Sequence, residues 1–482
     1  MPTVNLSRRK FSHLLLNTAF AAPMLLTNRA AHGASHSRPF RQPPLDPGRI
    51  EAGRRVFDLS VAKGRTEFFL GHETDTIGIN STFLGPVLQA KAGDRLRMNV
   101  ANRIAEPMTL HWHGLHLPAS ADGGPHQSFG PGETWSPEFD LLQKAGTFWF
   151  HGHQHHQTGA HVWAGMAGIL RVEDDEEAAL ALPRNYGEDD FILILQDRRF
   201  DATFQMPYAL NMHTRMTGLQ GDQALVNGQM NPVLETDVPR IRLRLINASN
   251  GSIYWLRFAD KRTFWQIASD GGLLAAAEPM PELLLAPGER AEVIIELHNG
   301  EPAFLQADVF GAEAAFSGAT ATFDFMEIRP RKAQPPAPAL PARLVEMAPV
   351  PEQTGVTRRL RLDMTGMGMM GDFTINGARY DHSRIDFAVP LGAVETWVIE
   401  NTTPMLHPMH VHDVQFRILT RNGIPVAPQE AGLKDVVLVD PGQKVELRMA
   451  FSDFSDPVLP YMYHCHILEH EDAGMMGQFT VV

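Results

Sequence analysis

The strongest constraint on the fold is a unit that recurs three times along the chain of 482 residues. In each copy a Pro-Gly turn precedes a segment of alternating or β-branched residues, and the turns begin at Pro131, Pro287 and Pro441. Upstream of each turn, another alternating segment ends near an asparagine: Asn99, Asn247 and Asn401. Alternation is typical of half-buried strands, and many short strands separated by turns are typical of β-sandwiches and barrels. Chance recurrence of a common turn would not carry matching flanks, so the pattern predicts an all-β chain of three similar β-sandwich domains.

The repeats set the expected domain boundaries. They place the domains at about 45–175, 185–330 and 357–482, which agrees with a length too great for one hydrophobic core. The segment 331–356 is rich in Pro and Ala and is predicted to be a linker. The acidic, alanine-rich stretch 173–182 is expected to be a second linker with a short helix.

Residues 1–34 are predicted to be an export signal rather than part of the fold. Ser7-Arg8-Arg9-Lys10-Phe11 is a twin-arginine pattern, followed by a modest apolar run and by small residues suited to cleavage. The run is too short and broken to span a bilayer, and no other stretch resembles a membrane span. We therefore expect the twin-arginine export machinery as a partner and the periplasm as the location. The alternative is an ordinary cytosolic start with two adjacent arginines.

The overall charge and the single cysteine exclude other classes. A formal net charge of −13 argues against nucleic-acid binding, which needs a basic surface. With Cys465 as the one cysteine, an intramolecular disulfide is impossible. A lone thiol in an exported protein needs something to hold it, although a lone cysteine can also serve as a small buried apolar residue.

The histidines point to a metal cluster. Ten of the 22 fall in four clusters: His111 and His113; His151 and His153; His407, His410 and His412; His464, His466 and His470. Side chains at positions i and i+2 of a strand point to the same face, so each His-x-His presents two imidazoles to one side. The four pairs supply eight imidazoles, more than one ion binds. Because the pairs lie in the first and third repeats, those two domains are expected to meet around a metal cluster.

Cys465 predicts a second, different site. It lies between His464 and His466, so its thiol points to the opposite face of the strand. Two histidines, one thiolate and a weak axial methionine form a blue-copper site, and His407, His470 and Met475 are the candidates to complete it. Zinc is the alternative, but zinc sites favour several thiolates or closed tetrahedral sets.

The chain resembles the three-domain multicopper oxidases at these residues. HWHG at 111–114, HGH at 151–153, HPMHVH at 407–412 and HCHILEHEDAGMM at 464–476 match the family signatures. DGG at 122–124, VNGQMNP at 226–232 and GLKDVV at 432–437 extend the match. The resemblance is closest to bacterial periplasmic copper-efflux (cuprous) oxidases and then to bacterial laccases. It implies three cupredoxin-like Greek-key domains and four copper ions.

The resemblance also implies a role for each ligand. His407, Cys465, His470 and Met475 would form the type 1 site; His111 and His410 would hold the type 2 copper; His113, His151, His153, His412, His464 and His466 would hold the type 3 pair. In the family, substrate gives up single electrons at type 1, and the trinuclear cluster reduces dioxygen to water. Asp122 and Glu471 match positions linked to proton delivery, although a turn-capping Asp and a solvated Glu are the simpler alternatives.

The match to copper-efflux oxidases breaks before the third domain's first strands. Their long Met- and His-rich insertion is replaced by a short cluster containing Met364, Met367, Met369 and Met370, which either binds Cu(I) or forms an adaptable apolar loop. Without the insertion, we expect the type 1 edge to be more open to bulky phenols. Asp435 matches an acidic residue near that edge and is expected either to contact substrate or to be structural. Five further histidines match no ligand position: His116, His126, His155, His156 and His161.

The combined prediction is an exported, monomeric multicopper oxidase. It would couple oxidation of Cu(I), phenols or aromatic amines to the reduction of dioxygen to water. Two alternatives belong to other classes. One is a copper-free cupredoxin-like protein of the cell envelope, although such relatives lose ligands that this chain retains. The other is a passive periplasmic copper-binding protein.

Overall fold

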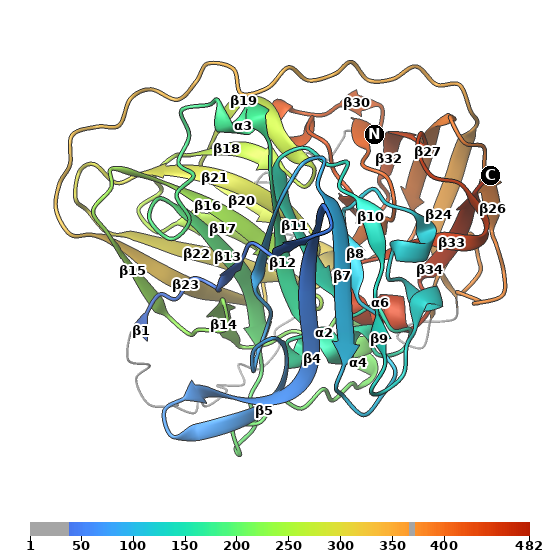
Figure 1. Ribbon diagram of the computed structural model, residues 1–482, viewed down its shortest axis with the longest axis horizontal. Helices are drawn as coiled ribbons and strands as arrows, with labels where there is room; N and C mark the ends of the chain where they lie inside the picture. The colour runs from blue at the N-terminus through green and yellow to red at the C-terminus, as the bar shows by residue number, and fades with distance from the viewer. Residues whose placement is uncertain (1–37, 366–371) are drawn as a thin grey trace, which may run out of the picture.

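The computed structural model describes residues 38–365 and 372–482. Its strands form six sheets that pair into three sandwiches, each around its own apolar core. In Figure 1 the middle sandwich lies at the left, the third at the right, and the first between them. The predicted signal at 1–34 and Met367, Met369 and Met370 lie outside the described residues.

The first sandwich pairs a sheet of order β10-β7-β4-β3, with β5 and β9 at its side, against a sheet of order β2-β6-β12-β11-β8. The bounds of these strands are β2 Leu45–Asp46, β3 Arg49–Glu51, β4 Arg54–Phe69, β5 His72–Ile79, β6 Val87–Lys91, β7 Arg95–Asn102, β8 His111–His113, β9 Thr134–Trp135, β10 Glu138–Asp140, β11 Gly146–His151 and β12 Ala167–Glu173.

The middle sandwich pairs the orders β14-β13-β16-β21-β18-β19 and β1-β15-β23-β22-β17-β20. Its strands are β1 Arg38–Pro39, β13 Asp190–Arg198, β14 Gln223–Val226, β15 Pro232–Thr236, β16 Arg240–Asn247, β17 Ile253–Phe258, β18 Phe264–Ser269, β19 Gly272–Met280, β20 Glu282–Leu285, β21 Arg290–Glu296, β22 Ala303–Phe310 and β23 Ala321–Pro330. Strand β1 precedes the predicted start of the first domain and joins the middle sheet beside β15.

The third sandwich pairs the orders β25-β24-β27-β32-β29-β30 and β26-β34-β33-β28-β31. Its strands are β24 Thr357–Thr365, β25 Asp372–Ile375, β26 Phe387–Val389, β27 Val394–Asn401, β28 His407–Val411, β29 Arg417–Arg421, β30 Ile424–Pro425, β31 Val436–Val439, β32 Lys444–Ala450, β33 Asp456–Cys465 and β34 Met476–Val481.

The described helices are short. They are α2 Thr158–Ala164, α3 Asp175–Ala178, α4 Met212–Thr217, α5 Ala314–Ser317 and α6 Leu468–Asp472, with 3-10 turns η1 Ala119–Ala121, η2 Pro125–Gln127 and η4 Pro428–Glu430. Helix α3 lies in the stretch where a linker with a short helix was predicted. Within the described ranges, no helix is long and apolar enough to cross a bilayer.

A buried asparagine marks the same corner in each sandwich. Asn247 donates to the carbonyls of Ser252 and Leu285, both at 2.8 Å, and Asn401 donates to those of Met405 and Val439 at 2.7 and 3.0 Å. In the first sandwich Asn102 occupies this corner. The residue that corresponds to Asn247 and Asn401 is therefore Asn102, whereas the repeat predicted Asn99. The three strands that end here, β7, β16 and β27, each pair in parallel with an earlier strand of the same sheet: β4, β13 and β24.

The segment 331–356 contains neither helix nor strand and connects the middle and third sandwiches. It runs along the upper edge of the molecule in Figure 1 and packs there, since Leu344 is buried and its N–H donates to the Ala275 carbonyl at 2.8 Å. The residue boundaries of the predicted domains and linker stay predictions.

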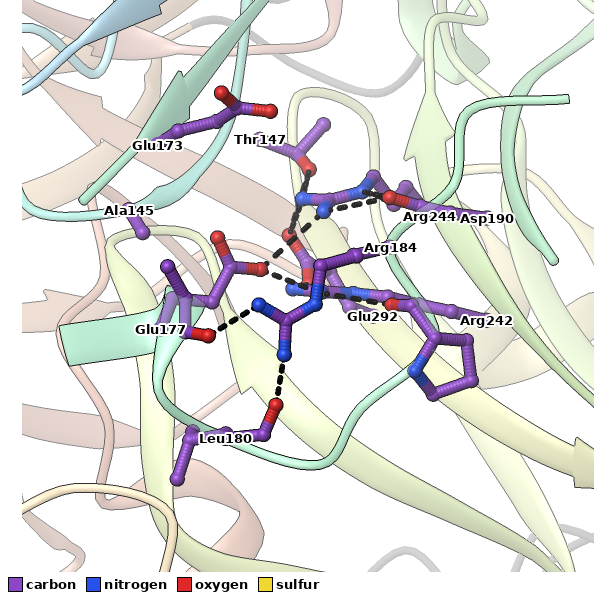
Figure 2. Close-up of polar contacts among 12 residues, drawn as sticks. Ala145, Thr147, Glu173, Glu177, Leu180, Arg184, Asp190, Arg242, Arg244 and Glu292 are labelled. Atoms are coloured by element: carbon purple, nitrogen blue, oxygen red, sulfur yellow. Dashed lines mark hydrogen bonds and ion pairs between the residues drawn. The ribbon is translucent and has the colours of Figure 1, made fainter. Parts of the chain in front are cut away.

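A buried network of charges joins the first and middle sandwiches (Figure 2). Arg244 forms a two-point contact with Asp190 at 2.8 and 2.9 Å and also donates to Glu292 at 2.9 Å. Arg242 pairs with Glu292 and with Glu177 of α3. These arginines occupy the polar positions of an alternating strand, which normally face solvent. Here each buried guanidinium pairs with a carboxylate, because a charge removed from water needs an oppositely charged partner.

Candidate metal centre

Strand pairing places the histidine pairs side by side. In the first sandwich β8 pairs with β11 so that His111 lies opposite His151. In the third, β28 pairs with β33 so that His410 lies opposite His464. His153, His412 and His466 follow directly after these strands, and both sets of strand ends meet where the first and third sandwiches touch. We call the eight residues the histidine cluster: His111, His113, His151, His153, His410, His412, His464 and His466.

The cluster divides into groups that combine both sandwiches. His113, His151 and His466 place one ring nitrogen each within 4.8 Å of one another, and so do His153, His412 and His464. His111 and His410 form a third group, with His113 nearby. All eight residues are buried. The structure thus brings together the imidazoles that the sequence assigned to a shared interface.

Hydrogen bonds fix which nitrogen faces inward. Nδ1 of His111 lies 2.9 Å from the Asp122 carbonyl, and Nδ1 of His410 lies 2.8 Å from the Asp435 carbonyl. A carbonyl can only accept, so both protons sit on Nδ1 and both Nε2 atoms carry bare lone pairs. These Nε2 atoms face each other at 3.4 Å. Two facing lone pairs in a buried site repel each other unless a cation lies between them, so the donor set fits a metal ion.

The same logic extends to the other groups. His151 and His464 direct Nδ1 to the carbonyls of Gly152 and Cys465 at 2.9 and 3.1 Å. The inward Nε2 of His464 then lies 3.2 Å from Nε2 of both His153 and His412. Both ring nitrogens of His466 are buried without a hydrogen-bond partner among the described residues, which a buried polar group avoids unless it binds something else.

Two carboxylates flank the cluster. Asp122 Oδ2 lies 2.8 Å from Nδ1 of His412, and Glu471 Oε2 lies 3.2 Å from Nδ1 of His464. Both acids are almost completely buried. Burial raises the pKa of Asp122 well above its ordinary value, so this acid tends to keep a proton.

Cys465 forms a separate site on the other face of β33. Its Sγ lies 3.5 Å from Nδ1 of both His407 and His470, and Met475 is buried in the same core. Nε2 of His470 donates to the Met216 carbonyl at 2.9 Å, so its Nδ1 lone pair points at the sulfur. Nε2 of His407 contacts the Thr403 hydroxyl at 2.8 Å.

Burial sets the protonation of both sites. It lowers the pKa of His151 to about 3 and that of His153 and His470 to about 4, so these rings are neutral and can act as ligands at pH 7. Burial raises the pKa of the Cys465 thiol, so the thiolate forms only with a bound cation. Neutral imidazoles around a thiolate that needs a metal suit copper.

Comparison with known proteins agrees with this donor set. Multicopper oxidase family models match residues 60–177 and 353–482. The multicopper oxidase mco of Staphylococcus aureus is 35% identical over 442 residues, which cover 91% of each chain.

The chain belongs to the multicopper oxidase family.

Other relatives widen the range of known roles. The laccase-like multicopper oxidase CueO of Ochrobactrum sp. matches with a TM-score of 0.83 and 33% identity, covering 92% of this chain and 100% of that chain. The all-β prediction with three cupredoxin-like domains is thereby confirmed. The cell division protein FtsP of Xenorhabdus nematophila is 34% identical over 489 residues, 99% of each chain.

The histidines of the Cys465 site are buried under neighbouring side chains. His407 and His470 are fully buried. The ring of Phe373, from β25, lies 5.0 Å from the His407 ring and 4.3 Å from the His470 ring, measured between centroids. Met364 of β24 packs partly buried against the same core. The ring of Phe373 thus packs beside both imidazoles, and an edge more open to bulky phenols stays a prediction.

Asp435 differs from one of its two expectations. It is fully buried, and its carboxylate contacts Arg290 and Nε2 of His113. A role in substrate contact is wrong, because the carboxylate faces the histidine cluster and has no exposed surface. Sequence reasoning missed Arg290, Phe373 and Thr403, since neither residue type nor spacing marks them.

The five unmatched histidines stay outside the two sites. His116 contacts Asp413 and Asp453, His126 stacks on His382, His155 stacks on His156, and His161 is buried on α2. Among the described residues, none of the five belongs to a group placed to hold a metal ion.

Proposed function

We propose that this chain is a four-copper oxidase that couples one-electron oxidation of Cu(I), phenols or aromatic amines to four-electron reduction of dioxygen to water. The observation that supports it best is the facing of bare imidazole nitrogens across the histidine cluster, beside a Cys-His-His-Met site whose cysteine lies between His464 and His466. His407, Cys465, His470 and Met475 would hold type 1 copper. His111 and His410 would hold type 2, and the other six histidines of the cluster would hold the type 3 pair.

Copper would supply one-electron steps at the Cys465 site and dioxygen binding at the histidine cluster. The chain's own part is to connect and shield the two sites. Cys465 is bonded through its backbone to His464 and His466, which gives electrons a short covalent path. Asp122 and Glu471 would hold and pass on protons at their carboxylate oxygens, because reduction of dioxygen to water consumes four of them.

Copper content, colour and oxygen uptake of the purified protein test the proposal. Copper-loaded protein is expected to contain four copper ions per chain, to absorb strongly at about 600 nm from the copper–thiolate bond, and to consume oxygen when given 2,6-dimethoxyphenol or Cu(I). Cys465→Ser should lose the band and the turnover yet keep the remaining copper. His298→Gln, a partly exposed histidine outside both sites, is the control and should change neither.

A second candidate function is a non-enzymatic role in cell division. The FtsP relatives cover 99% of this chain, so this function has the same full-length support as the oxidase. A folded, copper-loaded protein without the absorption band and without oxygen uptake would favour it. Copper binding without oxygen uptake for any reductant would instead favour a passive copper store.

We also propose that the protein works as a monomer in the periplasm after export through the signal at 1–34. Expression with Arg8→Lys and Arg9→Lys together should keep the protein in the cytoplasmic fraction, whereas the unaltered protein should reach the periplasmic fraction. Equal periplasmic yields would contradict this location, and sedimentation of the exported protein checks its oligomeric state.

A further inference from the structure

The middle sandwich supplies no candidate copper ligand, yet one of its side chains reaches the histidine cluster. Arg290 opens β21 and pairs at two points with Asp435: Nη1 with Oδ1 at 2.5 Å and Nη2 with Oδ2 at 2.6 Å. The same guanidinium donates to the carbonyls of Asp270 at 2.9 Å and Thr147 at 3.2 Å. Both residues of the pair are buried, so the guanidinium holds Asp435 in one orientation.

Asp435 in turn contacts two histidines of the cluster. Its Oδ1 lies 3.0 Å from Nε2 of His113, and its backbone carbonyl lies 2.8 Å from Nδ1 of His410. A carboxylate that already accepts two guanidinium N–H groups accepts from the imidazole too. The proton of His113 therefore sits on Nε2, and its bare Nδ1 points inward, 3.4 Å from Nε2 of His151.

This orientation of His113 is reversed relative to its neighbours. His111, His151, His410 and His464 all direct Nδ1 to a backbone carbonyl and Nε2 inward. Only a partner on the Nε2 side can hold the opposite tautomer, and Asp435 is that partner.

We infer that Arg290 and Asp435 are positioning residues of the proposed trinuclear site: they fix His113 so that it offers Nδ1, and not Nε2, to copper. The inference rests on the proposed function. The middle sandwich carries no candidate ligand, but through Arg290 it would influence how His113 is oriented between the first and third sandwiches.

The ion pair of Arg290 and Asp435 leaves no room for a side chain at the neighbouring Gly114. A Cβ at Gly114 would lie 2.4 Å from Asp435 Oδ2 and 2.5 Å from Arg290 Nη2, and the backbone there has a φ of +85°. A glycine directly after His113 therefore allows the close approach of the ion pair, and a side chain at this position would push the pair away from the histidine.

Asp435→Asn is the sharpest test, because it keeps size and removes one charge. If the amide oxygen takes the place of Oδ2, which contacts Arg290 Nη2, the amide N–H takes the place of Oδ1, faces Nε2 of His113 and makes that nitrogen the acceptor. The proton then moves to Nδ1, where the ligand lone pair is needed. We expect less copper in the type 3 pair, a larger share of copper detectable by EPR because the coupled pair is broken, and turnover lowered about 10- to 100-fold. The band of the Cys465 site should keep its full intensity.

Two further variants keep the test decisive. Arg290→Lys retains the charge but loses the two-point contact, so it should show the same EPR change in weaker form even if Asp435→Asn fails to fold. Glu289→Gln is the matched control. Glu289 pairs with Lys434 in a second buried ion pair at this interface, with contact at 3.1 Å, and is not among the partners of His113; this variant should keep normal copper content and EPR.

The outcomes separate the inference from the function on which it rests. Wild-type copper content and EPR in both Asp435→Asn and Arg290→Lys would overturn the inference. Loss of the Cys465 band in parallel with the cluster copper would also overturn it, because that would show general destabilisation rather than positioning. An unaltered protein without four coppers or oxygen uptake would instead contradict the proposed function.

Discussion

One aromatic side chain packs directly beside the Cys465 site. The ring of Phe373 lies against those of His407 and His470, both of which are buried, so we expect this ring to limit the contact of a bulky substrate with the imidazoles. Phe373→Ala is expected to raise kcat/KM for 2,6-dimethoxyphenol several-fold and to change that for Cu(I) less, because a small ion needs less space. The change also costs about 3–5 kcal/mol of stability. Steady-state kinetics with both substrates measure the two changes in kcat/KM.

A control variant separates access from stability. Phe387→Ala removes a ring that packs on Trp397 and Phe479 in the core of the same sandwich, so it should cost similar stability without favouring phenols. An equal rise for both substrates in Phe373→Ala would show that the ring does not select by size.

His116 is expected to make stability depend on pH. Its two ring nitrogens lie 2.7 Å from Asp413 and Asp453. Burial lowers the pKa of His116, but the hydrogen bonds and charge of Asp413 outweigh it and raise the pKa to about 9. Because the folded pKa exceeds the ordinary value, the stabilisation is complete below about pH 6.5 and is lost as the pH rises through 9.

His116→Gln should therefore destabilise the protein by about 1–2 kcal/mol at pH 6 and by much less at pH 10. Urea unfolding of the variant and the unaltered protein at both pH values gives the two differences. A difference that did not change with pH would contradict an ion pair at this position.

At the scale of elements, the short helix α6 carries His470 and Glu471 but has too few residues to be stable alone. Glu469 ties it to the middle sandwich, where it accepts hydrogen bonds from Tyr208 at 3.0 Å, Asn250 at 2.9 Å and the backbone of Leu219 at 2.9 Å. The position of His470 thus depends on contacts from another sandwich.

Glu469→Ala is expected to leave three buried donors without a partner and to cost about 3 kcal/mol or more. It should also shift or weaken the absorption at about 600 nm, since His470 is the next residue. Tyr208→Phe removes one of the three hydrogen bonds and should cost about 1 kcal/mol. If the two variants were equally stable and kept the same spectrum, Glu469 would not be the tie proposed here.

Local periodicity explains what could be predicted about these elements. The two-residue period of a strand is a property of the backbone, so the opposite orientations of Cys465 and its flanking histidines followed from sequence. The partners of those side chains did not. Arg290 lies 145 residues from Asp435 in another sandwich, and Arg242 and Arg244 occupy polar positions that alternation assigns to solvent. Such contacts depend on how sandwiches pack, which local sequence does not encode.

At the scale of the molecule, metal binding and domain packing are coupled. The histidine cluster takes its members from the first and third sandwiches, so copper bound there would connect them. Removing copper with a chelator should lower the midpoint of thermal unfolding. A free ligand at 100 times its Kd stabilises the folded state by about 2.7 kcal/mol for one site. Calorimetry of the copper-loaded and copper-free protein measures the shift, and full recovery on adding copper back is the control.

The number of sandwiches could be predicted because each sandwich contains one copy of the turn-and-strand pattern that recurs along the sequence. The contribution of the middle sandwich could not, since it carries no paired histidines and sequence reasoning gave it no role at either site. The structure shows that it contributes to both: Arg290 pairs with Asp435, which contacts His113 of the histidine cluster, and the Met216 carbonyl accepts from His470.

The pairing of β28 with β33 makes the protein more sensitive to insertions than to substitutions. Met409 lies opposite Cys465, and His410 lies opposite His464. One residue added to β33 between Tyr461 and His464 would shift the strand by one position and turn every later side chain to the other face. The thiol would then enter the histidine cluster, and the imidazoles would leave it. Both sites would be lost together, although each ligand would still be present in the sequence. Changes of length among relatives should therefore be confined to the loops outside this strand pair.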